Sequence, residues 1–393
     1  MSKIVAITGA GAMSECMRQI NPDVVPAFPI TPSTQVIEDF SQFVADGKVD
    51  TEIITVESEH SAMSACIGAA AAGGRVMTAT SSAGMALLWE MLYVASSMRQ
   101  PIVMTLINRA MSAPINIHAD HSDSMGARDA GWIQLYAENN QEAYDNLIMA
   151  IKIAENMDVR LPVMVCMDGF IISHCVQTMQ LEDTEKIRLF VGEFASTYPV
   201  LDTENPASWG ALDLQDYYME HKRAQHMAMK NAKTVIKKVS GEFADIFGRK
   251  YELFESYQLE DAEQVIIAIN SVCGEIKEVI DERREKGDRV GLLKIRSFRP
   301  FPYEEIAAAL EGVKIVTVLD RSESMGAYGP LFTEIRTALF DAPQKPMVYN
   351  RIFGLGGREL FMSDIHDIFE ENKTYLETNR VEKMFDYLKV RGG

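Results

Sequence analysis

Residues 55–74 decide the fold of the first half of the chain. They run Thr55-Val56-Glu57-Ser58-Glu59-His60-Ser61-Ala62-Met63-Ser64-Ala65-Cys66-Ile67-Gly68 and continue as four alanines and two glycines. The apolar residues 53–56 predict a buried strand that stops at the two carboxylates, and a helix of small residues follows. Small side chains let a flat ligand approach the helix closely, so a carboxylate at the start of this helix could bind such a ligand. The structural alternative is an acid that the helix dipole favours near a helix N-terminus.

A second junction lies at residues 26–34, Pro26-Ala27-Phe28-Pro29-Ile30-Thr31-Pro32-Ser33-Thr34. Proline suits the first helical position, so Pro32 predicts a helix start with Thr31 as the N-cap. Such a start leaves a hydroxyl and free backbone N–H groups at a positive helix end, where a small carboxylate can bind. The N-cap role alone would also explain both residues.

A third junction is the run Ile102-Val103-Met104-Thr105-Leu106-Ile107-Asn108-Arg109, a predicted strand that ends in a cation. An arginine in this position can clamp a carboxylate through two parallel hydrogen bonds. A structural salt bridge is the alternative role for Arg109.

The order of predicted elements indicates an α/β fold. Over residues 1–180, short apolar runs alternate with helical patterns, which predicts a parallel sheet with helices on both faces. The predicted strands are residues 53–56, 76–80, 102–107 and 163–167. Ligands gather at the carboxyl ends of strands in such folds, and Glu59, Arg109 and Asp168 follow predicted strands.

The rest of the chain divides into a connector and a second domain. Residues 181–258 begin with turn-rich sequence and then predict a long, mixed-charge helix over residues 216–236. We expect this connector to wrap over a neighbouring part of the protein. Residues 259–393 predict a smaller α/β domain with strands at 265–269, 290–295, 315–318 and 347–351 and a helix at 275–286.

Composition excludes several classes of function. The 56 acidic and 38 basic residues give a net charge of −18, which argues against nucleic acid or an anionic membrane as partner. No apolar run is long enough for a membrane span, and the N-terminus has no signal-peptide pattern. The five cysteines are scattered and none forms a C-x-x-C motif, so we expect a cytoplasmic protein without an iron–sulfur cluster of its own.

Two further segments carry residues with chemical potential. His118, Asp120, His121 and Asp123 could form a mononuclear metal site, but an irregular loop that uses them for internal hydrogen bonds and shapes the active site is preferred. The run Gly354-Leu355-Gly356-Gly357 could cradle a phosphate, but we expect an interface or turn role, as for Arg296 and Arg299.

These segments resemble the alpha subunit of 2-oxoacid:ferredoxin oxidoreductases, most closely the pyruvate:ferredoxin type. The matching motifs are FPITPST (28–34), ESEHSAMSA (57–65), TSSAGMALLWEML (80–92), NRAMSAPINIHADHSD (108–123), DGFIISH (168–174) and LLKIRSFRPFP (292–302). They occur in the family's order and spacing over nearly the whole chain. The resemblance implies two parallel-sheet domains, a pyrimidine-binding-type fold for thiamine diphosphate followed by a transketolase C-terminal-like domain.

The resemblance also implies the cofactors and the site residues. Glu59 would hydrogen-bond the pyrimidine N1′ of thiamine diphosphate, with Glu57 as its rival, because strand alternation places both on one face. Thr31 would hydrogen-bond the 2-oxoacid and Arg109 would neutralise its carboxylate. The Asp168-Gly169 pair lacks the rest of the motif that holds Mg²⁺ and diphosphate. The diphosphate half of the site, Mg²⁺ and the [4Fe-4S] clusters are therefore expected on partner subunits of beta, gamma and delta type.

The expected reaction is oxidative decarboxylation of pyruvate to acyl-CoA and CO₂, with electrons passed to ferredoxin and coenzyme A as acyl acceptor. Enzymes for 2-oxoisovalerate, 2-oxoglutarate or oxalate remain alternatives, although an oxalate dianion would call for a second cation near Thr31. A non-catalytic scaffold subunit is the alternative from a different class.

Overall fold

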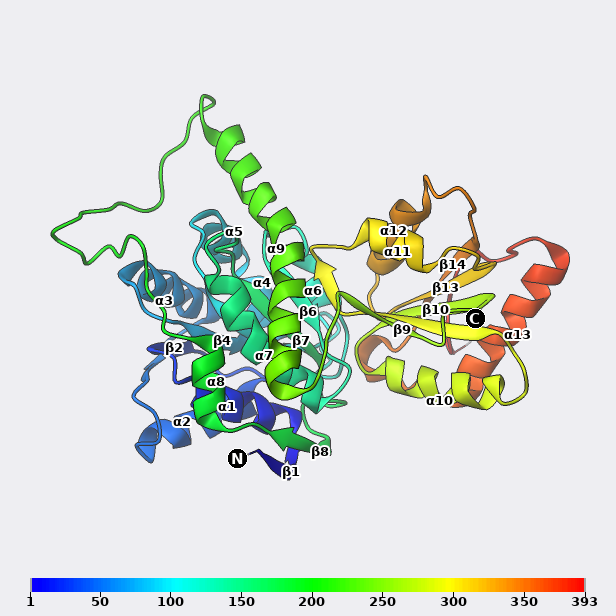
Figure 1. The fold of residues 1–393 in the computed structure, drawn as a ribbon, viewed down its shortest axis with the longest axis horizontal. Coiled ribbons are helices and arrows are strands. Elements are labelled where there is room, and N and C mark those ends of the chain that lie inside the picture. Colours follow the sequence, from blue (N-terminus) through cyan, green and yellow to red (C-terminus); the bar gives the residue numbers. More distant parts are fainter. Residues whose placement is uncertain (1, 392–393) are drawn as a thin grey trace.

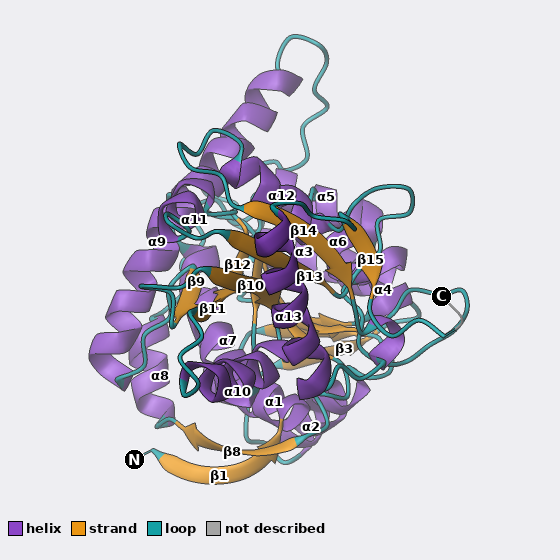
Figure 2. Cartoon of the chain, turned by 90° about the vertical axis from the view of Figure 1, so that its right-hand side faces the viewer, coloured by secondary structure: helices purple, strands orange, loops and turns teal. Residues whose placement is uncertain are grey.

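Buried apolar strands build two mainly parallel sheets, and helices cover both faces of each (Figures 1 and 2). This computed structural model describes residues 2–391. The predicted α/β class with two parallel-sheet domains is confirmed. Among the described residues, no helix combines the length and the apolar character that crossing a membrane requires.

The first sheet has the strand order β12-β6-β7-β5-β4. Its central strands are fully buried, which explains their continuous apolar sequences. The strands are β4 (Met77–Thr80), β5 (Val103–Asn108), β6 (Ile133–Tyr136), β7 (Val163–Asp168) and β12 (Ser297–Arg299). The surrounding elements are β1 (Lys3–Thr8), α1 (Gly9–Ile20), α2 (Thr34–Ala45), α3 (Glu59–Ala72), α4 (Ser82–Leu87), α5 (Trp89–Ser97), α6 (Ser122–Gly126), α7 (Asn140–Glu155), β8 (Val176–Leu181) and α8 (Thr184–Val191).

The strand that leads to Glu59 is an edge strand, so the prediction that residues 53–56 form a buried strand was wrong. β3 (Glu52–Thr55) pairs in parallel only with β2 (Val24–Ala27), which bridges at Val24 to Val76 beside β4. No strand covers the other side of β3 among the described residues, and Ile54 is 36% exposed. Apolar sequence alone could not distinguish this edge position from a central one.

The predicted long helix is present as α9 (Tyr218–Phe247), which lies along the first domain next to the junction with the second domain (Figure 1). Its buried residues recur at helical spacing, and Val235, Val239 and Phe243 join the same core as α7. Lys233 lies 2.8 Å from Glu304 of the second domain. The segment before α9 projects from the body of the protein as an extended loop (Figure 1).

The second sheet has the order β15-β14-β13-β10-β11-β9, in which only β9 is antiparallel to its neighbour. Helices α11 and α12 lie on one face, and α10 and α13 lie on the other (Figure 1). The elements are β9 (Phe254–Tyr257), β10 (Gln264–Ile269), α10 (Val272–Arg284), β11 (Val290–Ile295), α11 (Tyr303–Ala309), β13 (Ile315–Asp320), α12 (Pro330–Leu339), β14 (Met347–Ile352), the 3₁₀ turn Leu355–Gly357, α13 (Met362–Thr378) and β15 (Phe385–Tyr387).

The two sheets are joined by a strand exchange. β12 comes directly after β11 of the second sheet, yet it pairs antiparallel with β6 of the first sheet. One apolar cluster also runs through both domains and includes Trp132 and Phe298. Arg296, fully buried beside β12, donates a 2.7 Å hydrogen bond from Nε to Asn146 of α7, which agrees with its predicted interface role.

Candidate functional site

Glu59 begins α3 and is buried, with 5% of its surface exposed. The N-cap of this helix is Ser58, whose hydroxyl accepts a hydrogen bond from the Ser61 N–H. The Glu59 carboxylate therefore does not cap the helix. Within residues 2–391, no side chain or backbone group hydrogen-bonds its carboxylate. Because a buried carboxylate without a partner is unfavourable, this group is suited to a ligand that completes its hydrogen bonds.

The environment of Glu57 differs from that of Glu59, so the expectation that both lie on one face was wrong. The chain leaves β3 at Thr55 and bends, which ends the strand alternation before either carboxylate. Glu57 is exposed and accepts a 2.6 Å hydrogen bond from the Ser61 hydroxyl, which lowers the pKa of its carboxyl. Of the two, only Glu59 has the buried position expected of a cofactor-binding acid.

Arg109 directly follows β5 and is 6% exposed. Its guanidinium donates from Nε to the Asn116 carbonyl at 3.0 Å and from Nη1 to the Thr31 carbonyl at 2.8 Å. No carboxylate among the described residues pairs with it, so the predicted alternative of a structural salt bridge was wrong. A buried guanidinium that contacts only neutral carbonyls retains its capacity to bind an anion.

Thr31 lies next to Arg109, as the contact with its carbonyl establishes. Its predicted N-cap role was wrong, because α2 begins at Thr34 with Ser33 as the N-cap, and residues 31–33 form a turn. The Ser33 hydroxyl donates to the Ile30 carbonyl at 2.8 Å, which stabilises this turn. Thr31 is exposed, and none of the described residues bonds its hydroxyl.

Asp123 connects the Arg109 backbone with the start of α4. One carboxylate oxygen, Oδ2, accepts from the Ser82 and Arg109 N–H groups, both at 3.0 Å, and Oδ1 accepts from Asn108 Nδ2 at 2.8 Å. Burial raises the pKa of the Asp123 carboxyl to about 6, although these hydrogen bonds oppose the shift. Ser82 adopts a left-handed conformation with φ of 45°, and the bond to Asp123 stabilises this strained residue.

Helix α4 therefore links the two ends of the site. Its Ser82 bonds the Asp123 that holds Arg109, while its Gly84 contacts the Glu59 side chain. A methyl group on Gly84 would lie 2.6 Å from Glu59 Oε1. The structure thus brings Glu59, Arg109 and Thr31 around one short helix.

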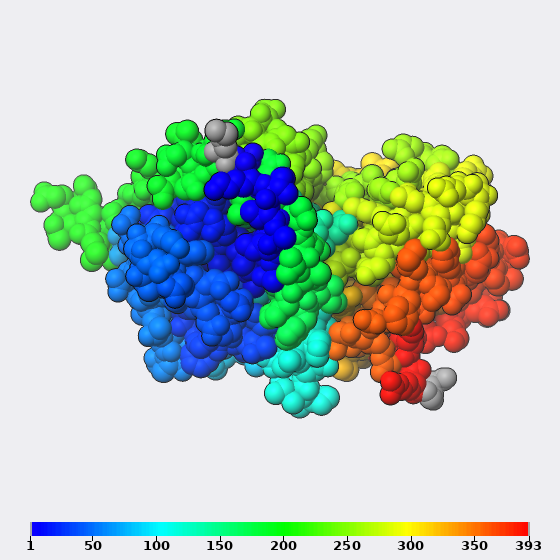
Figure 3. Space-filling model, turned by 90° about the horizontal axis from the view of Figure 1, so that it is seen from below, coloured from blue at the N-terminus to red at the C-terminus, as the bar shows by residue number. Residues whose placement is uncertain are grey.

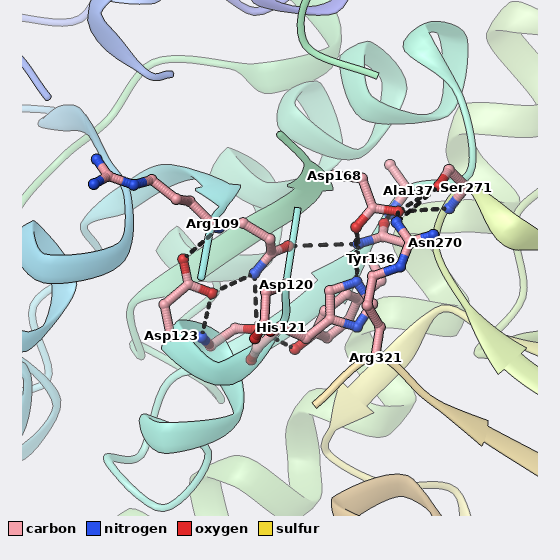
Figure 4. Close-up of polar contacts among 12 residues, drawn as sticks. Arg109, Asp120, His121, Asp123, Tyr136, Ala137, Asp168, Asn270, Ser271 and Arg321 are labelled. Atoms are coloured by element: carbon pink, nitrogen blue, oxygen red, sulfur yellow. Dashed lines mark hydrogen bonds and ion pairs between the residues drawn. The ribbon is translucent and has the colours of Figure 1, made fainter. Parts of the chain in front are cut away.

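A second buried network joins the two domains behind Asp123 (Figure 4). Asp168, at the end of β7, lies 2.8 Å from His121 Nε2 and 2.8 Å from Arg321 Nη1. Burial alone would raise the pKa of Asp168, but Arg321 and His121 lower it more, so the carboxyl has a pKa well below its ordinary value. Asn270 contacts both Asp168 and Asn108 at 3.4 Å.

The loop at residues 110–121 uses its polar groups for internal hydrogen bonds and for bonds to the second domain. His121 bonds Asp168, Asp123 bonds the Arg109 backbone, and Asp120 accepts from the Ser122 N–H at 2.7 Å. Among residues 2–391, no cluster of histidine, cysteine and acidic side chains is arranged to hold a metal ion. Figure 4 shows the Arg109 side chain extending away from the Asp168–Arg321 pair, although Asn270 and Asn108 link Asp168 to Asp123 through hydrogen bonds.

Sequence reasoning missed the groups that hold the site in place. Ser82 and Gly84 lie within the quoted motif at residues 80–92, whose run of small residues was the available signal. Asn270 and Arg321 gave no local signal, because each is far in sequence from its partners. Arg321, for example, is 153 residues from Asp168.

Comparison with known proteins identifies the family. Residues 15–241 match the model described as pyruvate flavodoxin/ferredoxin oxidoreductase, thiamine diphosphate-binding, and residues 262–365 match pyruvate:ferredoxin oxidoreductase core domain II. The pyruvate synthase subunit PorA of Thermotoga maritima is 55% identical over 93% of this chain and 94% of its own length. The corresponding subunit of Methanocaldococcus jannaschii is 48% identical over 98% and 97%. The ketoisovalerate oxidoreductase subunit VorA of Pyrococcus abyssi is 42% identical over 98% and 97%.

Solved structures share the fold. A 2-oxoglutarate:ferredoxin oxidoreductase from Magnetococcus marinus superimposes with a TM-score of 0.71 at 20% identity, over 94% of this chain and 65% of that one. A split-gene transketolase superimposes with a TM-score of 0.56 at 11% identity, over 94% and 99%. The family expected from the motifs is confirmed by the two domain matches and by the relatives: the chain belongs to the pyruvate flavodoxin/ferredoxin oxidoreductase family.

Proposed function

We propose that this chain is the alpha-type subunit of a thiamine-diphosphate-dependent 2-oxoacid:ferredoxin oxidoreductase, with pyruvate as substrate. The proposed reaction converts pyruvate, coenzyme A and oxidised ferredoxin into acyl-CoA, CO₂ and reduced ferredoxin. One observation carries the proposal: among the described residues, a buried carboxylate without a partner and a buried guanidinium without a carboxylate are both linked to the first turn of α4, through Gly84 and Ser82 respectively.

The surroundings of Glu59 fit the pyrimidine ring of thiamine diphosphate. The carboxylate can bond a ring nitrogen, and small residues of α3 leave room for a flat group beside it. When bound, this cofactor supplies the nucleophile for decarboxylation and the route for electrons from the substrate. Glu59 would hydrogen-bond the pyrimidine N1′, because its buried carboxylate has no other hydrogen-bond partner among the described residues.

Arg109 and Thr31 would bind the 2-oxoacid. Arg109 carries the positive charge that neutralises a carboxylate, and its remaining N–H donors favour an oxygen pair. The Thr31 hydroxyl supplies one neutral hydrogen bond beside it. Since Thr31 adds no charge, this arrangement suits a substrate with a single carboxylate and disfavours oxalate or 2-oxoglutarate.

The other half of the cofactor site would come from a partner subunit. Asp168 is the acid in the segment that comes nearest to a diphosphate-binding motif. Its carboxylate already pairs with Arg321 and His121. Apolar side chains near the site are exposed, which supports a partner surface there. They are Ile54 (36%), Leu87 (53%), Trp89 (40%) and Ile115 (77%). We place Mg²⁺ and the [4Fe-4S] clusters on subunits of beta, gamma and delta type, and the complex in the cytoplasm.

The test is to assemble the chain with its partner subunits and measure ferredoxin reduction with coenzyme A and each oxoacid. Pyruvate should give the highest kcat/KM, and the chain alone should show no turnover and bind thiamine diphosphate poorly in the presence of Mg²⁺. Micromolar cofactor binding by the isolated chain, or turnover without partners, contradicts the shared site.

A subunit for 2-oxoisovalerate is the second candidate. The relatives named ketoisovalerate oxidoreductase subunit VorA match at 42% identity over 98% or more of this chain. The higher identity to pyruvate synthase subunits favours pyruvate. A higher kcat/KM for 2-oxoisovalerate than for pyruvate in the assembled complex would reverse this choice.

A further inference from the structure

We propose that the second domain positions Arg109 for substrate binding through Asn116. The contact is made by residues 354–357, called here the glycine loop. This inference rests on the proposed role of Arg109 as the group that binds the substrate carboxylate. It adds a positioning role for a domain that supplies none of the residues that bind substrate.

The position of the Arg109 guanidinium depends on the backbone of Asn116. The Asn116 carbonyl accepts the Nε–H at 3.0 Å, and the second partner is the Thr31 carbonyl. The loop around Asn116 has no regular secondary structure, and its Ile115 is 77% exposed. A loop with few buried apolar contacts requires other bonds to hold its carbonyl in one place.

Those bonds come from the glycine loop. The Asn116 side chain donates from Nδ2 to the Gly356 carbonyl at 3.0 Å, and the Gly357 N–H donates to the Ala119 carbonyl at 2.9 Å. The Asn116 amide oxygen also accepts from the His118 N–H at 2.7 Å, so one side chain connects both segments. Seen from below, the segment drawn in cyan projects where the first domain meets the second (Figure 3).

Close approach explains why glycines occupy this loop. Gly356 and Gly357 have φ of 62° and 79°, which glycine adopts without strain. A Cβ at Gly357 would lie 2.5 Å from the His118 Cβ, and one at Gly356 would collide with the Asn116 amide. The glycine loop therefore serves as a contact between the domains, as the sequence predicted in preference to a phosphate cradle.

The experiment measures steady-state kinetics of Asn116→Ala in the complex assembled with its partner subunits. The KM for pyruvate should rise about three- to tenfold, as expected for the loss of a neutral hydrogen bond that orients the guanidinium. The KM for coenzyme A and the Tm should stay unchanged. Gly356→Ala should also raise the KM for pyruvate, because its methyl group would displace the Asn116 amide, and its Tm should fall because alanine is strained at this φ.

Lys277→Ala is the matched control, because it removes a different interdomain ion pair. Lys277 lies 2.8 Å from Glu138, which stays paired with Lys294 at 2.8 Å. This control should leave the KM for pyruvate unchanged. An equal rise in KM for Lys277→Ala would overturn the specific role of Asn116.

A double-mutant cycle separates this inference from the proposed function. In an Arg109→Ala background, Asn116→Ala should cause no further rise in the KM for pyruvate, because its effect passes through Arg109. If the effects of the two substitutions on the KM are additive, the positioning role of Asn116 is overturned. The same holds if Asn116→Ala has a normal KM while Arg109→Ala has a raised one, and in both cases the proposed function of Arg109 still stands. A normal KM for Arg109→Ala overturns the proposed function of Arg109 and the inference with it.

Discussion

The Glu59 side chain and Gly84 are in such close contact that no side chain fits between them. A Cβ at position 84 would lie 2.6 Å from Glu59 Oε1 and 2.9 Å from Glu59 Cγ. It would also lie 2.5 Å from the Thr80 hydroxyl, which is buried. The Glu59 carboxylate can therefore take this direction only because residue 84 of α4 is a glycine.

Gly84→Ala should displace the Glu59 carboxylate and lower kcat by at least about tenfold, because a misplaced catalytic group loses its orientation. Gly68→Ala is the matched control: it lies on α3, and nothing lies within 4 Å of its added methyl group. Kinetics and Tm of both assembled variants provide the comparison. Normal kcat for Gly84→Ala would show that the Glu59 position is not critical.

Glu59→Gln should remove most of the activity and leave the fold intact. Glutamine keeps the shape but cannot exchange a proton, and loss of a positioned acid–base group lowers rates by about 10²–10⁴-fold. Glu57→Gln should be mild, since Glu57 is exposed and its carboxylate accepts a hydrogen bond from the Ser61 hydroxyl, which glutamine can also accept. If Glu57→Gln proves the crippling change, the assignment of the two acids is reversed.

Arg109→Ala should lower kcat/KM for pyruvate. The loss of transition-state stabilisation should be roughly 2–5 kcal/mol, because the substrate carboxylate loses its buried charge partner. Affinity for thiamine diphosphate should change little. Arg109→Lys should rescue only part of the loss, because lysine lacks the planar donor pair. Full activity of Arg109→Lys would indicate recognition of charge alone, without a bidentate contact.

Thr31→Val should lower kcat/KM less than Arg109→Ala does. The loss of transition-state stabilisation should be about 0.5–1.5 kcal/mol, as for one neutral hydrogen bond. The Tm should stay unchanged, because Ser33 and not Thr31 is the N-cap of α2. Steady-state kinetics beside thermal melts test both statements. A variant that melts early with a normal kcat/KM would assign Thr31 to the fold.

Asp123 should make stability depend on pH between about 4 and 6. Burial raises the pKa of its carboxyl from 3.8 to about 6, so the folded protein binds this proton more tightly than the unfolded chain. Its contribution to the free energy of unfolding is therefore fully present below pH 4 and is lost as the pH rises through about 6.

Asp123→Asn removes this titration. The unfolding free energy of the wild type should fall relative to the variant by roughly 3 kcal/mol between pH 4 and pH 6.5, from the two-unit difference in pKa. Denaturant titrations at several pH values measure the difference. Parallel curves for the two proteins would mean that Asp123 stays ionised throughout in the folded state.

The sequence predicted the central strands because burial on both faces requires continuous apolar runs. It could not predict the edge position of β3, which depends on what lies beside the strand. The alternation argument for Glu57 and Glu59 failed because the chain bends after Thr55. The Thr31 N-cap failed because the turn at residues 31–33 delays the helix until Thr34.

The residues of the candidate site could be named in advance because each lies in one local motif, and their roles stay predictions. Glu59, Thr31 and Arg109 were named from local sequence and the family resemblance, and the structure places them together. The groups that hold them are contacts between distant segments, such as Asp168 with Arg321 and Asn116 with Gly356. Their side chains have no local pattern that could reveal the partner.

The exchange of β12 affects how the chain is made. During synthesis β6 emerges long before residues 297–299, and until then it is an unpaired edge of the first sheet. At about 5–20 residues per second, ribosomes need roughly 8–30 seconds to deliver the intervening residues. Over that interval a nascent chain exposes an apolar edge that can pair with other chains. Translation speed and chaperone capacity are therefore expected to govern the yield of this subunit.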